Sequence, residues 1–270
     1  MIDDIKKDLS IVKLFLLDMD GTIYIDNHLI DGTLDFLDYI NQINGRKIYI
    51  TNNSSKSVLD YVKKLTTLGI NATPSDFFTS SMATTFYLNE NYKDKLIYVM
   101  GTASLIKELS SGGVRTTTNL KDPVEVVLLG YDTELTYKKL EDVCILLKQD
   151  LPYIATNPDM VCPTSYGYAP DCGSFADMIY NATKKRPFFI GKPNPMMLQY
   201  AVSMANVTLE ETIVIGDRLY TDIASGKNAG ITTVCVLSGE ATLDDIQLSD
   251  IKPDFIFPSV KELLIELKKN

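Results

Sequence analysis

Short apolar runs alternate with amphipathic stretches along most of the chain. Residues 12–17 form an apolar run typical of a strand buried on both faces, and residues 47–50 form a second. Thr33 is expected to cap the helix between these strands, and Ser57 with Asp60 makes the capping-box pattern that opens the next helix. Because strands and helices alternate, we expect a parallel sheet covered by helices on both faces.

The same alternation returns near the C-terminus. Residues 212–215, 233–237 and 255–257 read as strands. Residues 220–228 read as a helix, and Ser259 is placed to cap a final one. The two ends of the chain are therefore expected to contribute to one core.

A second α/β region lies between these two parts of the chain. Its predicted strands are residues 96–100, 124–129 and 153–155, and its predicted helices are residues 103–109, 136–148 and 174–184. We therefore predict an α/β protein with a doubly wound, Rossmann-like parallel-sheet core, residues 1–78 and 188–270. An inserted α/β domain, residues 79–187, interrupts that core.

Composition narrows the class of protein. A net charge of −9 in 270 residues argues against nucleic acid or an anionic membrane as the main partner. No apolar run approaches the roughly 20 residues of a membrane-spanning helix. The N-terminal MIDDIKKDLS does not read as a secretory signal, so a cytoplasmic protein is expected. The oligomeric state stays open, with a homodimer as one option.

The four cysteines change this picture little. They contain no C-x-x-C pair, so a zinc site is not expected. A disulfide framework is unusual in a chain of this length.

Polar residues follow several of the predicted strands. In an open parallel sheet, ligands bind beyond the carboxyl ends of the strands, so these positions are the candidates for chemistry. They are Asp18 and Asp20; Thr51, Asn52 and Asn53; Lys192; and Asp217 and Asp222.

Two carboxylates separated by one residue repel each other and resist losing water. A hard cation such as Mg²⁺, bound between Asp18, Asp20 and Asp217, would offset that repulsion. Lys192 would add positive charge, and a phosphate could then bind despite the acidic protein. Thr51 and Asn52 could donate hydrogen bonds to its oxygens.

Each motif taken alone also has a purely structural explanation. Asp18 and Asp20 could form a solvated turn. A calcium loop is excluded, because Ile23 and Leu29 occupy the positions at which it needs glycine and glutamate. Lys192 could be an ordinary surface lysine. The joint occurrence of the motifs, in this order, favours catalysis.

Four segments together resemble a known family. DMDGT, TNN, GKPNP and GDRLYTD resemble, in this order, the motifs of the haloacid dehalogenase-like phosphatases. The domain inserted between the second and third motifs resembles the second cap type of that superfamily, found in the branch of NagD and the p-nitrophenyl phosphatases. The similarity covers nearly the whole chain, including ATNPDMVCP and YAPDCGSF in the cap.

The resemblance implies a role for each candidate residue. Asp18 would attack phosphorus, and Asp20 would act as acid and then base, with its backbone carbonyl as a metal ligand. Thr51 and Lys192 would bind the phosphoryl group, and Asn52 and Asn53 lie in the same phosphate-binding motif. The residues that would hold Mg²⁺ are Asp18, Asp20 and Asp217, with Asp222 in an outer position.

The implied activity is Mg²⁺-dependent hydrolysis of small phosphate monoesters, such as a sugar phosphate, a nucleotide, phosphoglycolate or p-nitrophenyl phosphate. Cap residues near Asn157, Pro170 and Asp171 are expected to contact the leaving group. A phosphomutase is the enzymatic alternative. A non-catalytic protein that binds a phosphorylated ligand is the second alternative, although it would be expected to carry a damaged Asp18 or Asp20.

Overall fold

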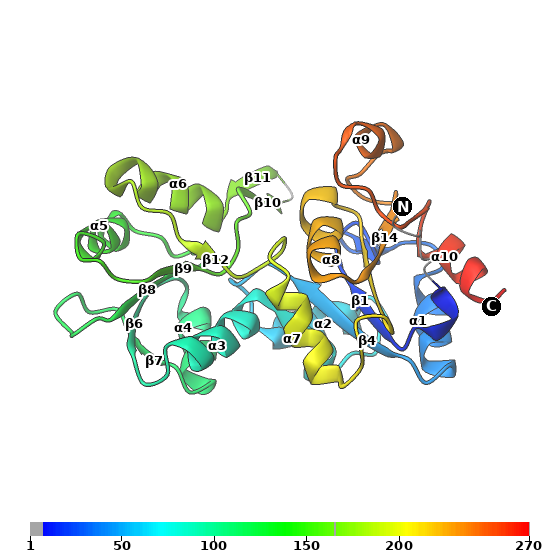
Figure 1. Ribbon diagram of the computed structural model, residues 1–270, viewed down its shortest axis with the longest axis horizontal. Helices are drawn as coiled ribbons and strands as arrows, with labels where there is room; N and C mark the ends of the chain where they lie inside the picture. The colour runs from blue at the N-terminus through cyan, green and yellow to red at the C-terminus, as the bar shows by residue number, and fades with distance from the viewer. Residues whose placement is uncertain (1–7, 165, 270) are drawn as a thin grey trace, which may run out of the picture. The chain divides into compact units, whose positions relative to one another are not determined.

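The computed structural model describes residues 8–164 and 166–269 (Figure 1). They form two compact units. The first contains the described residues up to Thr51, then Val62–Phe78, and the chain from Pro193 onward. The second contains Asn52–Tyr61 and Thr79–Lys192. Most of the stretch read as lacking a secretory signal lies outside the described residues.

The first unit is built on a six-stranded sheet with the order β15-β14-β13-β1-β4-β5. β1 pairs in parallel with both β13 and β4, and β14 pairs in parallel with β13 and β15. All four residues of β1 are buried, which explains their unbroken apolar run. The strands are β1 (Leu14–Leu17), β4 (Arg46–Thr51), β5 (Phe77–Thr79), β13 (Thr212–Gly216), β14 (Thr232–Val236) and β15 (Phe255–Phe257).

Helices and short turns complete this unit. The helices are α1 (Thr33–Gln42), α2 (Val58–Thr67), α7 (Met196–Ala205), α8 (Ala224–Ala229), α9 (Leu243–Leu248) and α10 (Val260–Leu267). The boundary between the two units falls within α2. The shorter elements are the antiparallel hairpin of β2 (Tyr24–Ile25) and β3 (His28–Leu29), the 3₁₀ turns η1 (Leu9–Ile11) and η2 (Pro74–Asp76), and the π-helical turn η3 (Leu219–Ile223).

The second unit has a parallel sheet and a core of its own. The strand order is β12-β9-β8-β6-β7. Helix α3 packs against α4 and α5 against α6, and Figure 1 shows the two pairs on opposite faces of this sheet. The strands are β6 (Leu96–Met100), β7 (Arg115–Thr117), β8 (Val126–Leu129), β9 (Tyr153–Ala155) and β12 (Phe188–Phe189), with an antiparallel hairpin of β10 (Val161–Thr164) and β11 (Gly167–Pro170). The helices are α3 (Ser80–Asn91), α4 (Ala103–Ser111), α5 (Tyr137–Leu146) and α6 (Cys172–Thr183).

The predicted fold class is confirmed, and the local predictions differ in their outcome. Ser57 and Asp60 form the expected capping box, with backbone-to-side-chain distances of 3.0 and 3.3 Å. Thr33 does not cap α1, because Gly32 occupies the N-cap position at φ 80°. The Thr33 hydroxyl instead donates a 3.0 Å hydrogen bond to the Ile23 carbonyl.

The units differ from the predicted domains at two places in the chain. Asn52–Tyr61 and residues 188–192 belong to the second unit, whereas the sequence placed both segments in the core. Hydrogen bonds explain the difference. Asn52 bonds to Lys192 and Asp159, and Ser54 bonds to Thr156. No helix within the described ranges combines the length and the apolar character needed to cross a membrane.

Candidate active site

Two of the predicted carboxylates lie at the switch point of the first unit's sheet. Asp18 follows β1 and Asp217 follows β13, and these strands are parallel neighbours with Leu17 beside Ile215. The Asp18 N–H donates a 2.9 Å hydrogen bond to the Ile215 carbonyl. Because β4 pairs with the other side of β1, the chain order reverses here, and ligands of doubly wound sheets bind at such a point.

A third carboxylate joins this pair. Ligand oxygens of Asp18, Asp217 and Asp222 all lie within 4.8 Å of one another. Asp217 and Asp222 are 2% and 0% exposed, so water screens their charges poorly. Among the described residues, the Asp20 carboxyl is not part of this group. The sequence predicted that the Asp20 carboxylate would share the cation with Asp18 and Asp217, and the structure does not place it in their cluster. Metal binding through the Asp20 backbone carbonyl, which the resemblance implied, stays a prediction.

The π-helical turn η3 explains how Asp222 enters the group. The Ile223 N–H bonds to the Arg218 carbonyl, five residues earlier, as does the Ala224 N–H to Leu219. This wider turn places side chains five residues apart on one face, and such turns are frequent at functional sites. The sequence predicted an ordinary helix over residues 220–228, and the outer role of Asp222 was implied by the family resemblance.

Asp217 is held firmly and has an unusual protonation equilibrium. The Glu240 N–H donates to its Oδ2 at 2.8 Å, and the Thr22 hydroxyl contacts Oδ1 at 3.4 Å. Burial first, and then the charges of Asp18 and Asp222, raise the pKa of Asp217 to about 7. A bound cation would relieve this repulsion.

Two glycines allow the backbone to surround Asp217 closely. Gly21 has φ +88°, and a Cβ there would lie 2.4 Å from Asp217 Oδ2. A Cβ on Gly239 would lie 2.0 Å from the same oxygen. Any larger residue at either position would displace the carboxylate.

Asp20 is exposed, yet its carboxyl is perturbed. Partial removal of this carboxyl from water raises its pKa above the usual value, and the charges of Asp18 and Asp26 raise it further. Lys64 and Arg218 act in the opposite direction. A raised pKa favours the protonated form, which suits a proton donor.

The donor set fits a hard divalent cation. Carboxylate oxygens are the ligands that Mg²⁺ prefers, and the group contains no nitrogen or sulfur atom. Asp18 and Asp217, which the sequence proposed as ligands, lie together in it. The buried repulsion at Asp217 is the feature that a cation would offset.

The remaining predicted residues differ in their surroundings. Thr51 ends β4 in the first unit and is half-buried. Lys192, 3% exposed, lies in the second unit with Asn52 and Asn53. The Asn53 side-chain oxygen accepts hydrogen bonds of 2.9 and 2.8 Å from the backbone and hydroxyl of Ser55.

The Asn52 side chain does not fit the role predicted for it. Its amide nitrogen donates to Asp159 Oδ1 at 3.1 Å and to the Lys192 carbonyl at 2.9 Å. Both amide protons are therefore used within the protein, and none remains for a phosphate oxygen. No sequence pattern predicted these partners.

The cap residues expected near the leaving group are also engaged internally. Asn157 is fully buried, and its amide donates to Asp171 Oδ1 at 3.1 Å. Asp171 accepts from the Cys172 N–H at the start of α6. Burial is the main cause that raises the pKa of Asp171 to about 6. Of the three predicted residues, only Pro170 is exposed.

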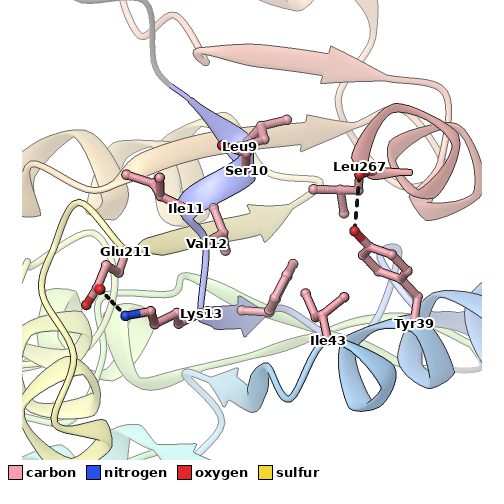
Figure 2. Close-up of a pocket in the computed structure, with 10 residues that line it drawn as sticks. Leu9, Ser10, Ile11, Val12, Lys13, Tyr39, Ile43, Glu211 and Leu267 are labelled. Carbon is pink, nitrogen blue, oxygen red and sulfur yellow. Dashed lines mark hydrogen bonds and ion pairs between the residues drawn. The ribbon is translucent and has the colours of Figure 1, made fainter. Parts of the chain in front are cut away.

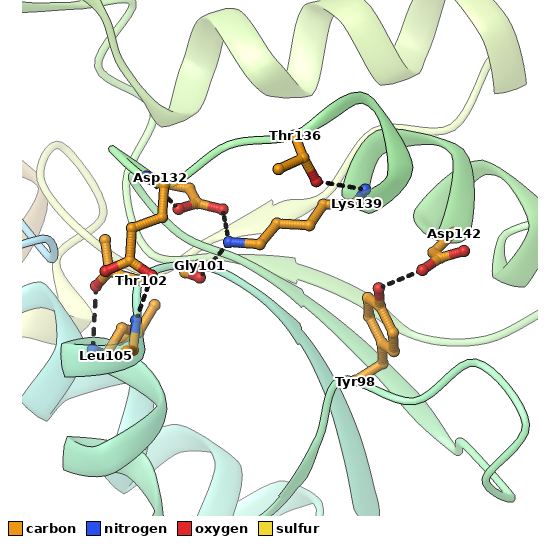
Figure 3. Close-up of polar contacts among 10 residues, drawn as sticks. Tyr98, Gly101, Thr102, Leu105, Asp132, Thr136, Lys139 and Asp142 are labelled. Atoms are coloured by element: carbon orange, nitrogen blue, oxygen red, sulfur yellow. Dashed lines mark hydrogen bonds and ion pairs between the residues drawn. The ribbon is translucent and has the colours of Figure 1, made fainter.

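The sheet of the second unit has its own switch point, between β6 and β8. There the Lys139 ammonium lies 2.7 Å from Asp132 and donates to the Gly101 carbonyl at 3.0 Å (Figure 3). Thr102 caps α4 by accepting from the Leu105 N–H. The polar groups that follow β6 and β8 are thus bonded to one another or to the start of α4.

A pocket of about 630 Å³ lies at the amino-terminal edge of the first unit's sheet (Figure 2). Ile11 and Ile43 line it together with Leu267, whose carbonyl accepts from Tyr39. Its ammonium group, on Lys13, is 2.5 Å from Glu211. It therefore lacks the clustered like charges that mark the opposite edge.

The structure defines an α/β protein with a cluster of three carboxylates that could hold a cation. A model of the haloacid dehalogenase-like hydrolases matches residues 15–115, and a HAD-hydrolase-like model matches residues 189–263. The chain is also 33% identical over 255 residues to the acid sugar phosphatase of Staphylococcus epidermidis, covering 94% of this chain and 98% of that protein. The chain belongs to the haloacid dehalogenase-like hydrolases, which confirms the predicted family.

Solved structures agree with this assignment. The 4-nitrophenylphosphatase of Thermotoga maritima matches with a TM-score of 0.91 and 38% identity, over 96% of this chain and 98% of that one. The glycerol phosphate phosphatase of Mycobacterium tuberculosis, in complex with magnesium, matches with a TM-score of 0.88 and 27% identity. That alignment covers 94% of this chain and 77% of the other.

Proposed function

We propose that this hydrolase cleaves small phosphate monoesters in a Mg²⁺-dependent reaction through an aspartyl phosphate on Asp18. The grouping of Asp18, Asp217 and Asp222 at the switch point of the sheet carries the proposal. The names of the relatives, an acid sugar phosphatase and a 4-nitrophenylphosphatase, support a phosphorylated small molecule as substrate. We therefore propose sugar phosphates as the first class to test.

In the first step, a carboxylate oxygen of Asp18 attacks phosphorus and the bond from phosphorus to the leaving oxygen breaks. Asp20 donates its proton to that oxygen, so the product leaves as an alcohol. The raised pKa of Asp20 supports this role, because it keeps more of the carboxyl protonated.

In the second step, Asp20 accepts a proton from water as the water oxygen attacks phosphorus. The bond between phosphorus and the Asp18 oxygen then breaks. Inorganic phosphate leaves, Asp18 is again a carboxylate and Asp20 is again protonated. The leaving-group proton and the water proton therefore balance over one turnover.

Asp18, Asp217 and Asp222 would hold the Mg²⁺ ion, together with the Asp20 carbonyl. When bound, the ion would supply positive charge that offsets the carboxylate repulsion and the charge of the phosphoryl group. The complex of a relative with magnesium supports this choice of metal.

Lys192 and Thr51 are proposed to bind the phosphoryl group, whose negative charge is spread over three oxygens. Asn53 and the backbone of Asn52 remain proposed contributors to the same function. A small phosphorylated metabolite is the proposed partner. A cytoplasmic location and a homodimer stay predictions.

The decisive experiment measures phosphate release from a panel of sugar phosphates, nucleotides, phosphoglycolate and p-nitrophenyl phosphate, with Mg²⁺ and with a chelator. We expect release only with Mg²⁺, and almost none from Asp18→Asn because its amide is a poor nucleophile. Asp31→Asn, at an exposed ion pair with Lys261, is the matched control and should behave as wild type. If the whole panel stays intact with Mg²⁺ present, the proposal is wrong; isomerised sugar phosphate without free phosphate would indicate a mutase.

A further inference from the structure

The Asn52 side chain makes a reciprocal pair of hydrogen bonds with the backbone of Lys192. Its amide donates to the Lys192 carbonyl at 2.9 Å, and its oxygen accepts from the Lys192 N–H at 2.8 Å. This is the bonding pattern that a neighbouring strand would provide. Both residues are buried, Asn52 at 6% and Lys192 at 3% exposure, so these bonds compete little with water.

The Asn52–Lys192 pair continues, beyond the end of β9, the hydrogen bonds that β9 makes to the neighbouring segment. The N–H groups of Ile190 and Gly191 donate to the carbonyls of Ala155 and Thr156 at 3.0 and 2.8 Å. At Lys192 the partner changes to the Asn52 carboxamide. The backbone fits closely here, because a Cβ on Gly191 would lie 2.6 Å from Asn52 Oδ1.

Asn52 is itself fixed from two further sides. The Ser80 hydroxyl donates to its carbonyl at 2.6 Å. Asp159 Oδ1 accepts the second amide proton at 3.1 Å. A carboxylate can only accept hydrogen bonds here, so Asp159 selects the amide orientation that presents Oδ1 to the Lys192 N–H. Asp159 in turn is held by the Gly173 N–H, which donates to its carbonyl at 2.8 Å.

We propose that Asn52 is a positioning residue that fixes the backbone of Lys192 for its work on the phosphoryl group, and that Asp159 orients Asn52. This inference rests on the proposed function for the role of Lys192. A misplacement of about 1 Å at a catalytic group can cost on the order of 100-fold in rate, so support of this kind has a kinetic consequence.

The test compares Asn52→Ala with Ser54→Ala, using p-nitrophenyl phosphate and Mg²⁺. Asn52→Ala should lower kcat by about 10- to 100-fold, because Lys192 loses both backbone bonds. Ser54 lies in the same loop and is equally buried, with bonds to Thr156 and to the Tyr131 N–H. Ser54→Ala should lower the unfolding temperature but leave kcat close to that of wild type. Equal losses of kcat in both variants would overturn the proposal.

A double-mutant cycle separates positioning from general stability. If Asn52 acts through Lys192, adding Asn52→Ala to Lys192→Ala should change kcat little further. Additive losses would assign Asn52 a role that does not pass through Lys192 and would overturn the inference.

If Asn52→Ala does not fold, a second variant tests whether Asn52 positions Lys192. Asp159→Asn preserves volume but lets the Asn52 amide adopt either orientation, so a smaller fall in kcat is expected. Unchanged kcat in folded Asp159→Asn would overturn the proposal. An inactive wild type would instead defeat the proposed function. Active wild type with a slow Lys192→Ala and a normal Asn52→Ala would defeat this inference alone.

Discussion

Each unit contains a parallel sheet, but the charges of the side chains at the carboxyl ends of the strands differ between the two units. The first gathers three acidic side chains, of which two are almost fully buried. The second places one buried acid, Asp132, against the Lys139 ammonium. Burial first, and then the neighbouring charges of Asp18 and Asp222, raise the pKa of Asp217, whereas Asp132 forms an ion pair with Lys139. The contrast supports the proposal of a cation site at the first edge, whereas the ion pair at the second edge needs no added ion.

Neighbouring polar groups in the second unit support this interpretation. Thr156, Asn157 and Asp171 are buried and hydrogen-bonded in series, at 2.8 and 3.1 Å. A chain of satisfied partners rigidifies a loop without requiring a ligand. Hydrogen bonds among these buried groups therefore account for them without a ligand.

The largest effect is expected from a substitution in the carboxylate cluster of the first unit. Asp217→Asn should lower kcat/KM by at least about 100-fold, since it removes one charge from the proposed cation site. Titration calorimetry with Mg²⁺ should show weakened binding. The protein should remain folded, because the amide can still accept the Glu240 hydrogen bond. Normal Mg²⁺ affinity in this variant would contradict the contrast between the two edges.

The next largest effect is expected when the ion pair at the carboxyl edge of the second sheet is removed. Asp132→Ala leaves the Lys139 ammonium without its buried partner and should lower the free energy of unfolding by about 3 kcal/mol. Urea denaturation measures this loss, while kcat below the transition should stay near the wild-type value. Lys95→Ala, at an exposed ion pair with Glu125, is the control and should change stability little. A large loss of kcat in Asp132→Ala would mean that the second edge also serves the chemistry.

The sequence predicted strands well where both faces of the strand are buried. β6 and β9, whose residues are nearly all buried, have the predicted bounds, because an apolar run marks such strands directly. α3 was not predicted, since its buried face consists largely of small or hydroxyl residues such as Ser80, Ser81, Ala83 and Thr84. Periodicity of apolar residues cannot reveal such a helix.

The candidate site likewise contains residues that the sequence could predict and residues whose surroundings it could not. Asp18 and Asp217 could be predicted because each directly follows a strand of one parallel sheet. The surroundings of Asn52 could not, because its partners Asp159 and Lys192 lie 107 and 140 residues away along the chain. Only the folded structure brings these three residues together, and no local pattern records it.

The smallest expected effect concerns how the free energy of unfolding depends on pH through a buried acid of the second unit. Asp171 binds its proton more tightly in the folded protein, with a pKa of about 6, than in the unfolded chain, where an ordinary Asp titrates near 3.8. The folded state therefore holds more protons between these values, and this residue's contribution to stability, complete below about pH 4, is lost as the pH rises through 6. Asp171→Asn keeps a residue suited to the N-cap and mimics the neutral acid.

Asp171→Asn should therefore exceed wild type in free energy of unfolding at pH 7, by on the order of 2 kcal/mol, and match it near pH 4. Urea titrations at the two pH values measure the difference. Asp177→Asn, on the exposed side of α6, controls for the loss of a carboxylate. An Asp171→Asn variant less stable than wild type at pH 7 would show that the ionised acid is stabilising, and would contradict this account of the buried carboxyl.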